Sequence, residues 1–173
     1  MALNCKISTP ISAACETNVS GVLKVWFANW DEAHTFTASE GCAIDTIDLG
    51  SEKFYPIAVV DNTASATADL TVGSSNDSKY INHTVSGTIA KLDCGLLGDY
   101  KNFLLGTVVI AVLTKNREVF IFGADNGLTA TTFAYATGAA EGDANGVSFV
   151  FEGAQPNAPL KVKDASVIKA LEA

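Results

Sequence analysis

Five residues near the C-terminal end of the chain match the spacing of a calcium-binding loop. Within EGDANGVSFVFE, the residues at positions one, three, five, six and twelve of that pattern are Glu141, Asp143, Asn145, Gly146 and Glu152. Carboxylate and amide oxygens are the ligands that Ca²⁺ takes, and a glycine at position six allows the sharp turn. The alternative interpretation is a polar turn that precedes a strand.

The residues after this turn favour a strand over a calcium site. Residues 147–151 (VSFVF) alternate in the way that is typical of a strand with one buried face. If the segment is extended, Glu152 lies about 20 Å from Gly146 at about 3.3 Å per residue, too far to close a cation cage. We therefore expect no metal here, and no cofactor.

Cysteine and histidine residues are few and lack the spacing of a zinc site. No CxxC pair occurs, and only His34 and His83 could join a metal site. We interpret both histidines as surface residues. We interpret the cysteines as buried thiols in a reducing compartment, with a disulfide between the first two as the alternative. The cysteines are Cys5, Cys15, Cys42 and Cys94.

Other arrangements that could do chemistry have simpler structural interpretations. The sequence contains no nucleophile elbow and no phosphate-cradling loop. Scattered carboxylates such as Asp45 and Asp48 are typical of solvated faces rather than of an acid–base pair. Trp26, Phe27 and Trp30 could stack on sugars or bases, but their alternating segment favours core packing or a contact between subunits. We expect no catalytic residue and no enzyme.

The elements that position these residues centre on residues 91–127. The spacing of its large apolar residues predicts a helix over 93–105, with Asp93 as N-cap and a left-handed Gly106 at its end. Residues 107–113 are apolar and β-branched, which predicts a strand covered on both faces. A polar turn at 115–117, a returning strand at 119–122 and a turn at 126–127 follow. The predicted helix stripe comprises Leu96, Leu97, Tyr100, Phe103 and Leu104.

The remaining elements fit one domain over residues 1–173. Residues 1–20 read as an arm, 31–41 and 137–146 as loops, and 155–159 as a turn. Strands are predicted at 21–30, 42–49, 128–135 and 147–151. Residues 160–173 form a C-terminal tail, in which 163–173 is either a short helix or an ordered segment. In the first strand, Val22, Lys24, Trp26 and Ala28 share one face, opposite Leu23, Val25 and Phe27.

Residues 54–91 have the pattern of a long β-hairpin excursion. Two Thr- and Ala-rich arms flank a Gly/Ser/Asn/Asp tip and carry few large apolar side chains. A two-stranded ribbon is marginal in water, and open strand edges invite pairing with another chain. We therefore expect the hairpin to contact neighbouring subunits. The tip residues proposed for that contact are Gly73, Ser74, Ser75, Asn76, Asp77, Ser78 and Lys79.

Composition and charge exclude several functional classes. The 173 residues are 48% hydrophobic and 17% charged, which allows a sizeable core and argues against a disordered chain. The net charge of −8 leaves no basic cluster to hold nucleic acid. Neither a secretory signal nor a membrane span is evident, so we expect a protein that is soluble and intracellular when synthesised.

Several segments together resemble tail-tube-type virion structural proteins, most closely those of Bacteroidetes and crAss-like phages. The C-terminal half carries the order KLD, helix, VVIAVLTKNREVFIFGADNG and TGAAEGDANGVSFVFEGAQPNAP, and VSGVLKVWFANWDE resembles the opening strand of the family. These segments cover more than half of the chain. The region from residue 42 to residue 85 matches only in layout.

The resemblance implies a mainly β fold: a β-sandwich or partly closed barrel with one flanking helix and a long hairpin. It also implies self-assembly into rings, hexameric in that family, which stack into the tail tube of a virion after synthesis in the host cytoplasm. Other tail or connector proteins would be further partners. DNA would pass without specific binding, because a lumen of carboxylates repels phosphates. Candidate lumen-facing residues are Asp61, Asp69 and Asp77.

Two other functional classes stay open. One is a different virion component with this fold: a head–tail connector, a tail terminator ring or a capsid decoration protein. The other is a β-sandwich module that binds glycans through the cluster of Trp26, Phe27 and Trp30. Self-assembly distinguishes the virion components from the glycan-binding module.

Overall fold

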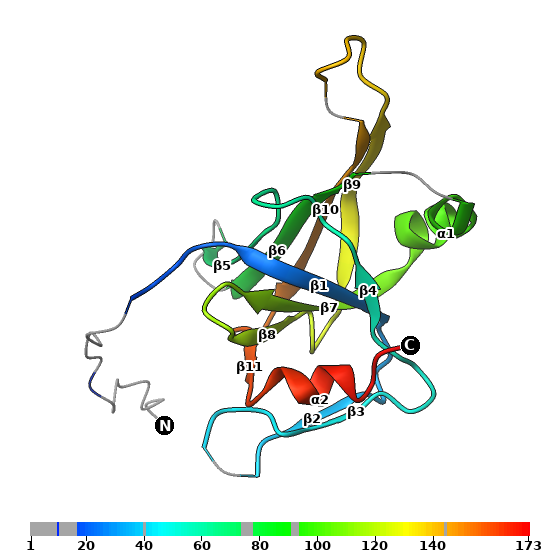
Figure 1. Ribbon diagram of the computed structural model, residues 1–173. Helices are drawn as coiled ribbons and strands as arrows, with labels where there is room; N and C mark the ends of the chain where they lie inside the picture. Colours follow the sequence, from blue (N-terminus) through cyan, green and yellow to red (C-terminus); the bar gives the residue numbers. More distant parts are fainter. Residues whose placement is uncertain (1–9, 11–16, 40, 74–77, 91–93, 144) are drawn as a thin grey trace.

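The computed structural model describes residues 10, 17–39, 41–73, 78–90, 94–143 and 145–173. Within them the protein is mainly β, with a large antiparallel sheet and two helices (Figure 1). The elements are β1 (Val22–Asn29), β2 (Thr35–Thr37), β3 (Thr46–Asp48), β4 (Tyr55–Ile57), β5 (Ser65–Val72), β6 (Lys79–Ile89), α1 (Cys94–Leu105), β7 (Thr107–Thr114), β8 (Val119–Phe122), β9 (Leu128–Ala136), β10 (Gly146–Gln155), β11 (Leu160–Val162) and α2 (Ala165–Lys169).

The large sheet bends into two leaves. The first leaf has the strand order β4-β1-β7-β8-β11, and the second has the order β9-β10-β6-β5. In the described part of the chain, the strand pairing that joins the leaves lies at the start of β7, where Thr107 pairs with Thr129 and Val108 with Leu128. The strands of the leaves cross in Figure 1. This arrangement confirms the predicted sandwich-like fold.

Apolar side chains from both leaves meet between them and form the first core. Val25 and Phe27 of β1 pack there with residues of β7, facing Val85 of β6 and Phe149 of β10. The rings of Phe27 and Phe149 lie edge to face, with centroids 5.6 Å apart. Removal of this apolar surface from water is the main force that holds the leaves together.

A second core covers the outer face of the first leaf. Trp26 of β1 and Ile121 of β8 pack there against Ile47 of β3, Phe54 and Ile168 of α2. Figure 1 shows α2, β2 and β3 together below that leaf. β1 and β7 are therefore buried on both faces, as predicted for residues 107–113.

The alternation predicted for the first strand holds only from Lys24 onward. A β-bulge shifts the register between Val22 and Lys24, so Val22 packs against the same core as Val25 and Phe27. The prediction placed it on the opposite face. An extra residue in a strand reverses the side-chain direction of everything on one side of it.

Most of the central region agrees with its prediction. α1 and the β7–β8 hairpin occupy the expected segments, and Arg117 takes a positive φ of 66° in the turn. The prediction of a left-handed conformation at Gly106 is wrong, because the φ angle of this residue is not positive. Its N–H donates to the carbonyl of Asn102 at 2.7 Å and continues the helical turn. The proposed N-cap Asp93 lies outside the described residues.

Two further predictions, for residues 31–41 and for the C-terminal segment, can be compared with the structure. The expected 31–41 loop contains β2, which pairs with β3. The C-terminal helix is present as α2, and Asp164 caps it by accepting from the N–H of Ser166 at 2.7 Å. The tail beyond it is held by two backbone hydrogen bonds between Phe54 and residues 171 and 173.

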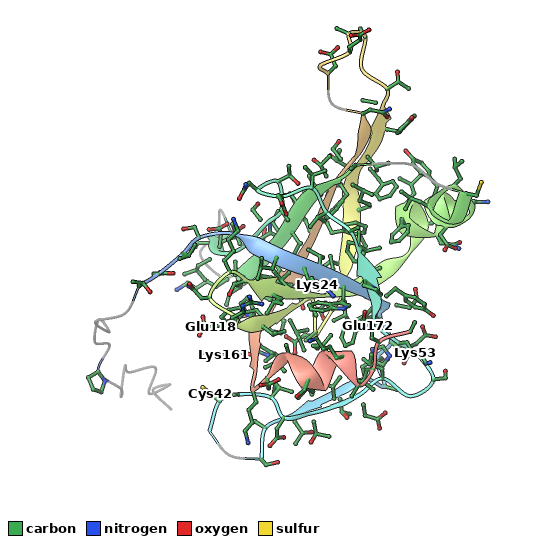
Figure 2. All side chains as sticks on the ribbon, in the orientation of Figure 1. Lys24, Cys42, Lys53, Glu118, Lys161 and Glu172 are labelled. Atoms are coloured by element: carbon green, nitrogen blue, oxygen red, sulfur yellow. The ribbon has the colours of Figure 1, made fainter. Side chains whose placement is uncertain are left out.

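An ion pair also holds the C-terminal segment against the first leaf. Lys161 of β11 donates to the Glu118 carboxylate at 2.5 Å, and the two side chains lie close together in Figure 2. This hydrogen bond raises the pKa of Lys161. Both side chains are more than one-third exposed, so the pair contributes little to stability, and the backbone pairing of β11 with β8 sets the position of this segment.

The predicted hairpin within residues 54–91 is present as β5 and β6. They pair antiparallel along the whole of β5, from Ser65 with Ser86 to Val72 with Lys79. The opposite side of β6 pairs with β10, so this strand is interior to the sheet. The hairpin that extends farthest from the body in Figure 1 is instead the one formed by β9 and β10.

Candidate functional site

One candidate interaction surface is the outer edge of β5, which we call the β5 edge and define as residues 65–72. Among the described strands β5 pairs with β6 alone, so its other row of backbone groups has no strand beside it. Its apolar Leu70 is 70% exposed, and Val72 is also exposed. An exposed edge with apolar side chains is a template for pairing with another chain.

A second candidate surface is the outer face of α1, which we call the α1 face and define as Leu97, Leu104 and Leu105. All three leucines are exposed, Leu105 to 71%, and the helix has no fully buried residue. The predicted helix stripe therefore divides: one part packs on the sheet, and Leu97 and Leu104 point away from it. Clustered apolar side chains on a protein surface mark sites of interaction.

The inner side of α1 packs against the second leaf and covers part of the edge of β9. The ring of Phe103 stacks on that of Phe133, with centroids 5.4 Å apart. The Tyr100 hydroxyl donates to the backbone carbonyl of Phe133 at 2.8 Å. α1 thus shields a strand edge that would otherwise be open to solvent, while the β5 edge has no such cover among the described residues.

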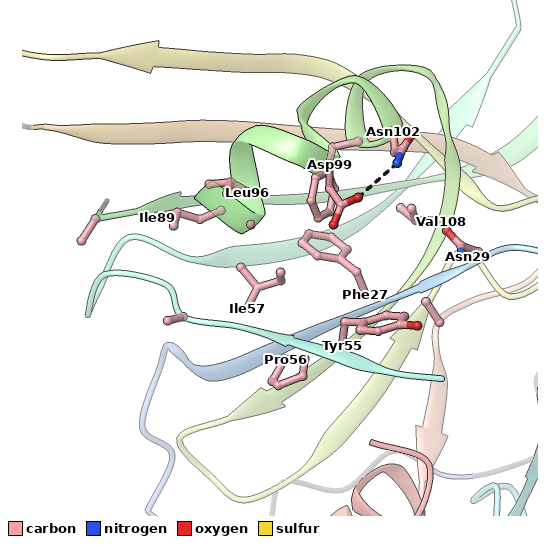
Figure 3. A pocket seen from close by; sticks show the side chains of 15 residues that line it. Phe27, Asn29, Tyr55, Pro56, Ile57, Ile89, Leu96, Asp99, Asn102 and Val108 are labelled. Carbon is pink, nitrogen blue, oxygen red and sulfur yellow. Dashed lines mark hydrogen bonds between the residues drawn. The ribbon is translucent and has the colours of Figure 1, made fainter. Parts of the chain in front are cut away.

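A groove of about 750 Å³ separates α1 from β4 (Figure 3). Its floor is apolar and includes Phe27, Ile57 and Leu96. Polar groups lie at its rim, where the Asn102 amide donates to the Asp99 carboxylate at 3.1 Å. The groove adjoins the α1 face and extends the apolar surface on that side of the molecule.

The residues proposed for contacts between subunits and for the lumen lie on or beside the β5–β6 hairpin. The N–H of Gly73 donates to the carbonyl of Ser78 at 2.7 Å and closes the base of the tip. Residues 74–77, which include the proposed Asp77, lie outside the described residues. Asp61, in the turn before β5, and Asp69, on β5, are both exposed. The structure therefore brings these two carboxylates to the hairpin side of the molecule.

The residues of the calcium pattern are used in two separate places. Asp143 accepts hydrogen bonds from the N–H groups of Ala140 and Ala139, each at 2.8 Å, and these bonds lower its pKa. Glu152 lies in β10, opposite Thr84 of β6, so the segment after Gly146 is extended as predicted. In the described part of the chain no three His, Cys, Asp or Glu side chains gather as metal ligands.

The interpretation of both histidines as surface residues is wrong for His83. Its side chain is 2% exposed and its Nδ1 accepts from the N–H of Gly123 at 3.2 Å. His34 is half-buried, and neither of its ring nitrogens makes a hydrogen bond within the described residues. Cys42 and Cys94 are exposed thiols rather than buried ones, while Cys5 and Cys15 lie outside the described residues.

The aromatic cluster is mainly part of the cores. Trp26 is fully buried and Phe27 nearly so, which removes both as a platform for sugars and confirms core packing. Trp30 is half-buried, and its indole N–H donates to the carbonyl of Ala124 at 3.4 Å.

Sequence reasoning missed Gln155, which is 1% exposed. Its side-chain oxygen accepts from the N–H groups of Asp125 and Asn126, and its nitrogen donates to the carbonyl of Gly127. One buried amide thus satisfies three backbone groups of the turn after β8. A signal existed, because residue 155 continues the alternation of 147, 149 and 151 along β10.

Neither described helix has the length and apolar character to cross a membrane. Comparisons with protein-family models, with curated proteins and with solved structures find no match to this chain.

Proposed function

We propose that this chain is a virion structural subunit that assembles with copies of itself into rings, which stack to form a tail tube. The observation that carries the proposal is that two apolar surfaces on different sides of one subunit, the β5 edge and the α1 face, are left exposed by the described residues. β5 lies at the left and α1 at the right of Figure 1.

Two different surfaces favour head-to-tail assembly over a symmetric dimer. An isologous dimer uses the same patch on both subunits, whereas a heterologous contact joins one patch to another and generates a ring or a filament. A strand edge supplies backbone hydrogen-bonding groups, and the groove beside α1 is bordered by the short strand β4. The β5 edge of one copy would therefore meet the α1 side of the next.

Charge supports passage of DNA rather than its capture. The chain carries a net charge of −8, and two exposed carboxylates lie near the hairpin: Asp61 in the turn before β5 and Asp69 on β5 itself. If the hairpin lines the ring, its carboxylates repel phosphates and keep the cargo from binding to the wall. Asp77, at the tip of the same hairpin, adds to that charge in this proposal.

Electron microscopy of the purified protein, with mass measured by light scattering, tests the assembly. Long hollow tubes support the tail tube. Single closed rings would instead assign the chain to the connector, terminator or decoration class. A compact monomer at high concentration would overturn self-assembly. Deletion of residues 73–79 should leave rings that no longer stack; normal tubes from that variant would exclude the tip as the contact between rings.

A complementation experiment tests the head-to-tail arrangement. L70D introduces a charge at the β5 edge and L105D introduces one at the α1 face, so each variant alone should fold but remain monomeric. In a mixture, the intact β5 edge of L105D can still meet the intact α1 face of L70D. The two variants should therefore form a dimer that contains one copy of each. L23D, at an exposed apolar residue outside both surfaces, is the matched control and should assemble normally. Failure of the mixture to dimerise would contradict the head-to-tail contact.

A further inference from the structure

His83 is buried between the two leaves, away from the start of β7 where strand pairing joins them. Its strand, β6, passes the end of β8 there, and the two belong to different leaves. The imidazole lies edge-on to the ring of Phe122, with centroids 5.5 Å apart. The polar side chain of His83 therefore connects the two leaves at this point.

The hydrogen bond at His83 requires a neutral ring. Because Nδ1 accepts from the N–H of Gly123, that nitrogen carries no proton, and the neutral imidazole keeps its proton on Nε2. The buried Nε2 makes no hydrogen bond of good geometry within the described residues. A second proton would have to go onto Nδ1, where it would face the Gly123 N–H.

We propose that His83 is an acid-sensitive latch between the leaves: protonation of Nδ1 breaks the bond to Gly123 and loosens the contact of β6 with the end of β8. This inference concerns the subunit itself and does not depend on the proposed assembly.

The surroundings of His83 oppose its charged form. Burial lowers its pKa, and the backbone carbonyl of Asn157 and the carboxylate of Asp125 offset that effect only in part. Asp125, in the turn after β8, is the charged group whose electrostatic interaction with the ring favours the protonated form. The residues paired with His83 on either side, Ala68 of β5 and Gly153 of β10, carry no charge.

The direction of the pH effect follows from this lowered pKa. The unfolded chain takes up a proton near the ordinary histidine value of 6.5, whereas the folded chain does so only at lower pH. The contribution of the neutral ring to stability is therefore complete above pH 6.5. It is lost progressively as the pH falls from 6.5 towards the folded pKa.

An apolar pocket lies beside His83, and breaking the His83–Gly123 bond would expose it to water. A pocket of about 430 Å³ lies between β5 and the first leaf, lined by Ala66, Ala68, Phe120 and Phe122 among others. The small alanine side chains leave this side of the core thinly packed. Separation of β6 from β8 would widen the pocket and admit water to Phe122.

Amide hydrogen exchange on the full chain tests the latch, because the chain contains only two histidines. The protection factor of the Gly123 amide, which corrects for intrinsic exchange, is compared at about pH 8 and about pH 5. We expect a several-fold fall in the wild type, because protonation of Nδ1 removes the acceptor of the Gly123 N–H. H83Q keeps an oxygen acceptor but does not titrate, so its protection should not change with pH. H34Q should behave like the wild type.

A second measurement covers the case in which H83Q does not fold. Nitrogen-15 shifts of the wild-type His83 ring report its tautomer and its titration directly. We expect the Nε2–H tautomer at neutral pH and a midpoint below that of an ordinary histidine. An Nδ1–H tautomer, a midpoint at or above 6.5, or equal pH dependence of Gly123 protection in H83Q and the wild type would overturn the proposal.

Discussion

The ring of Phe149 lies against the backbone of Gly87, its partner across the β6–β10 pair. A Cβ atom on Gly87 would approach Cζ of this ring to 2.7 Å, closer than such atoms pack in proteins. Phe149 also contacts Phe27 of the other leaf. The missing side chain on β6 thus lets one aromatic ring fill the space between the leaves.

Replacement of Gly87 should destabilise the fold by overpacking. We expect G87V to lower the free energy of unfolding by about 1–3 kcal/mol, because the rigid Phe149 ring has to move. Urea denaturation measures the change. In α1, G98A adds a Cβ where nothing lies within 4 Å and should be neutral or stabilising by up to about 1 kcal/mol. An equal loss in the two variants would contradict the packing argument.

The Gln155 amide predicts a strong polar effect at one buried position. Q155L keeps a similar volume but leaves two N–H groups and one carbonyl of the 125–127 turn without their partner. We expect a loss of about 2–4 kcal/mol, since each unsatisfied buried group costs about 1–3 kcal/mol and the turn relaxes in part. N157A, at an exposed neighbour, should change stability by about 0.5 kcal/mol or less. Thermal unfolding measures both.

Removal of the Tyr100 hydroxyl should loosen α1. Y100F loses the bond to the Phe133 carbonyl but keeps the ring contact, so we expect a loss of about 0.5–1.5 kcal/mol. Hydrogen exchange should show faster opening in α1 and along β9. Y135F removes an exposed hydroxyl whose bond to Asn145 is 3.3 Å long, and a loss as large as that of Y100F would count against the special role of Tyr100.

The cap of α2 should make part of the stability dependent on acid. The pKa of Asp164 is lowered because its carboxylate accepts from the backbone N–H of Ser166. The cap is therefore complete above the unfolded value of about 3.8 and is lost as the pH falls through the folded pKa. D164N should keep the cap without this pH dependence, and D164A should lower the melting temperature at neutral pH. Melting curves between about pH 2 and pH 7 test the three proteins.

The lumen proposal predicts a change in DNA retention rather than in folding. Asp61 is exposed and lies outside the β5 edge, so D61K should fold and assemble normally. Tubes of this variant should retain DNA at low salt and release it as salt is added. Wild-type tubes should retain none. D61K tubes that bind no DNA would exclude Asp61 from the channel wall.

Local patterns predicted the elements well where burial followed a simple period. The helix over 93–105 and the β7–β8 hairpin were found because their apolar spacing and turn residues agree. The same logic would have placed His83 inside, since it shares the inward face of β6 with Val85, Gly87 and Ile89. Its place in the predicted hairpin excursion led to the wrong prediction. A buried histidine has to find a partner, and Gly123 lies forty residues away.

The arrangement of the leaves could not be read from local signals. β1 pairs with β7, and β6 pairs with β10, across long intervening segments that carry no mark of the pairing. The bulge at Leu23 also has no distinct sequence signal. The exposed Leu97 and Leu104 were predicted to be buried with Tyr100 because spacing describes a helix face but not the width of the surface that receives it.

The pairing of β1 with β7 has a consequence during synthesis. β1 can pair early with the short strand β4, yet its longer partner β7 emerges only after β2 to β6 and α1 have been translated. Until then Val25, Trp26 and Phe27 lack most of the side chains that bury them in the two cores. The nascent chain therefore exposes the apolar side chains of β1 until β7 has been made, and a chaperone that binds this strand would raise the yield of native protein.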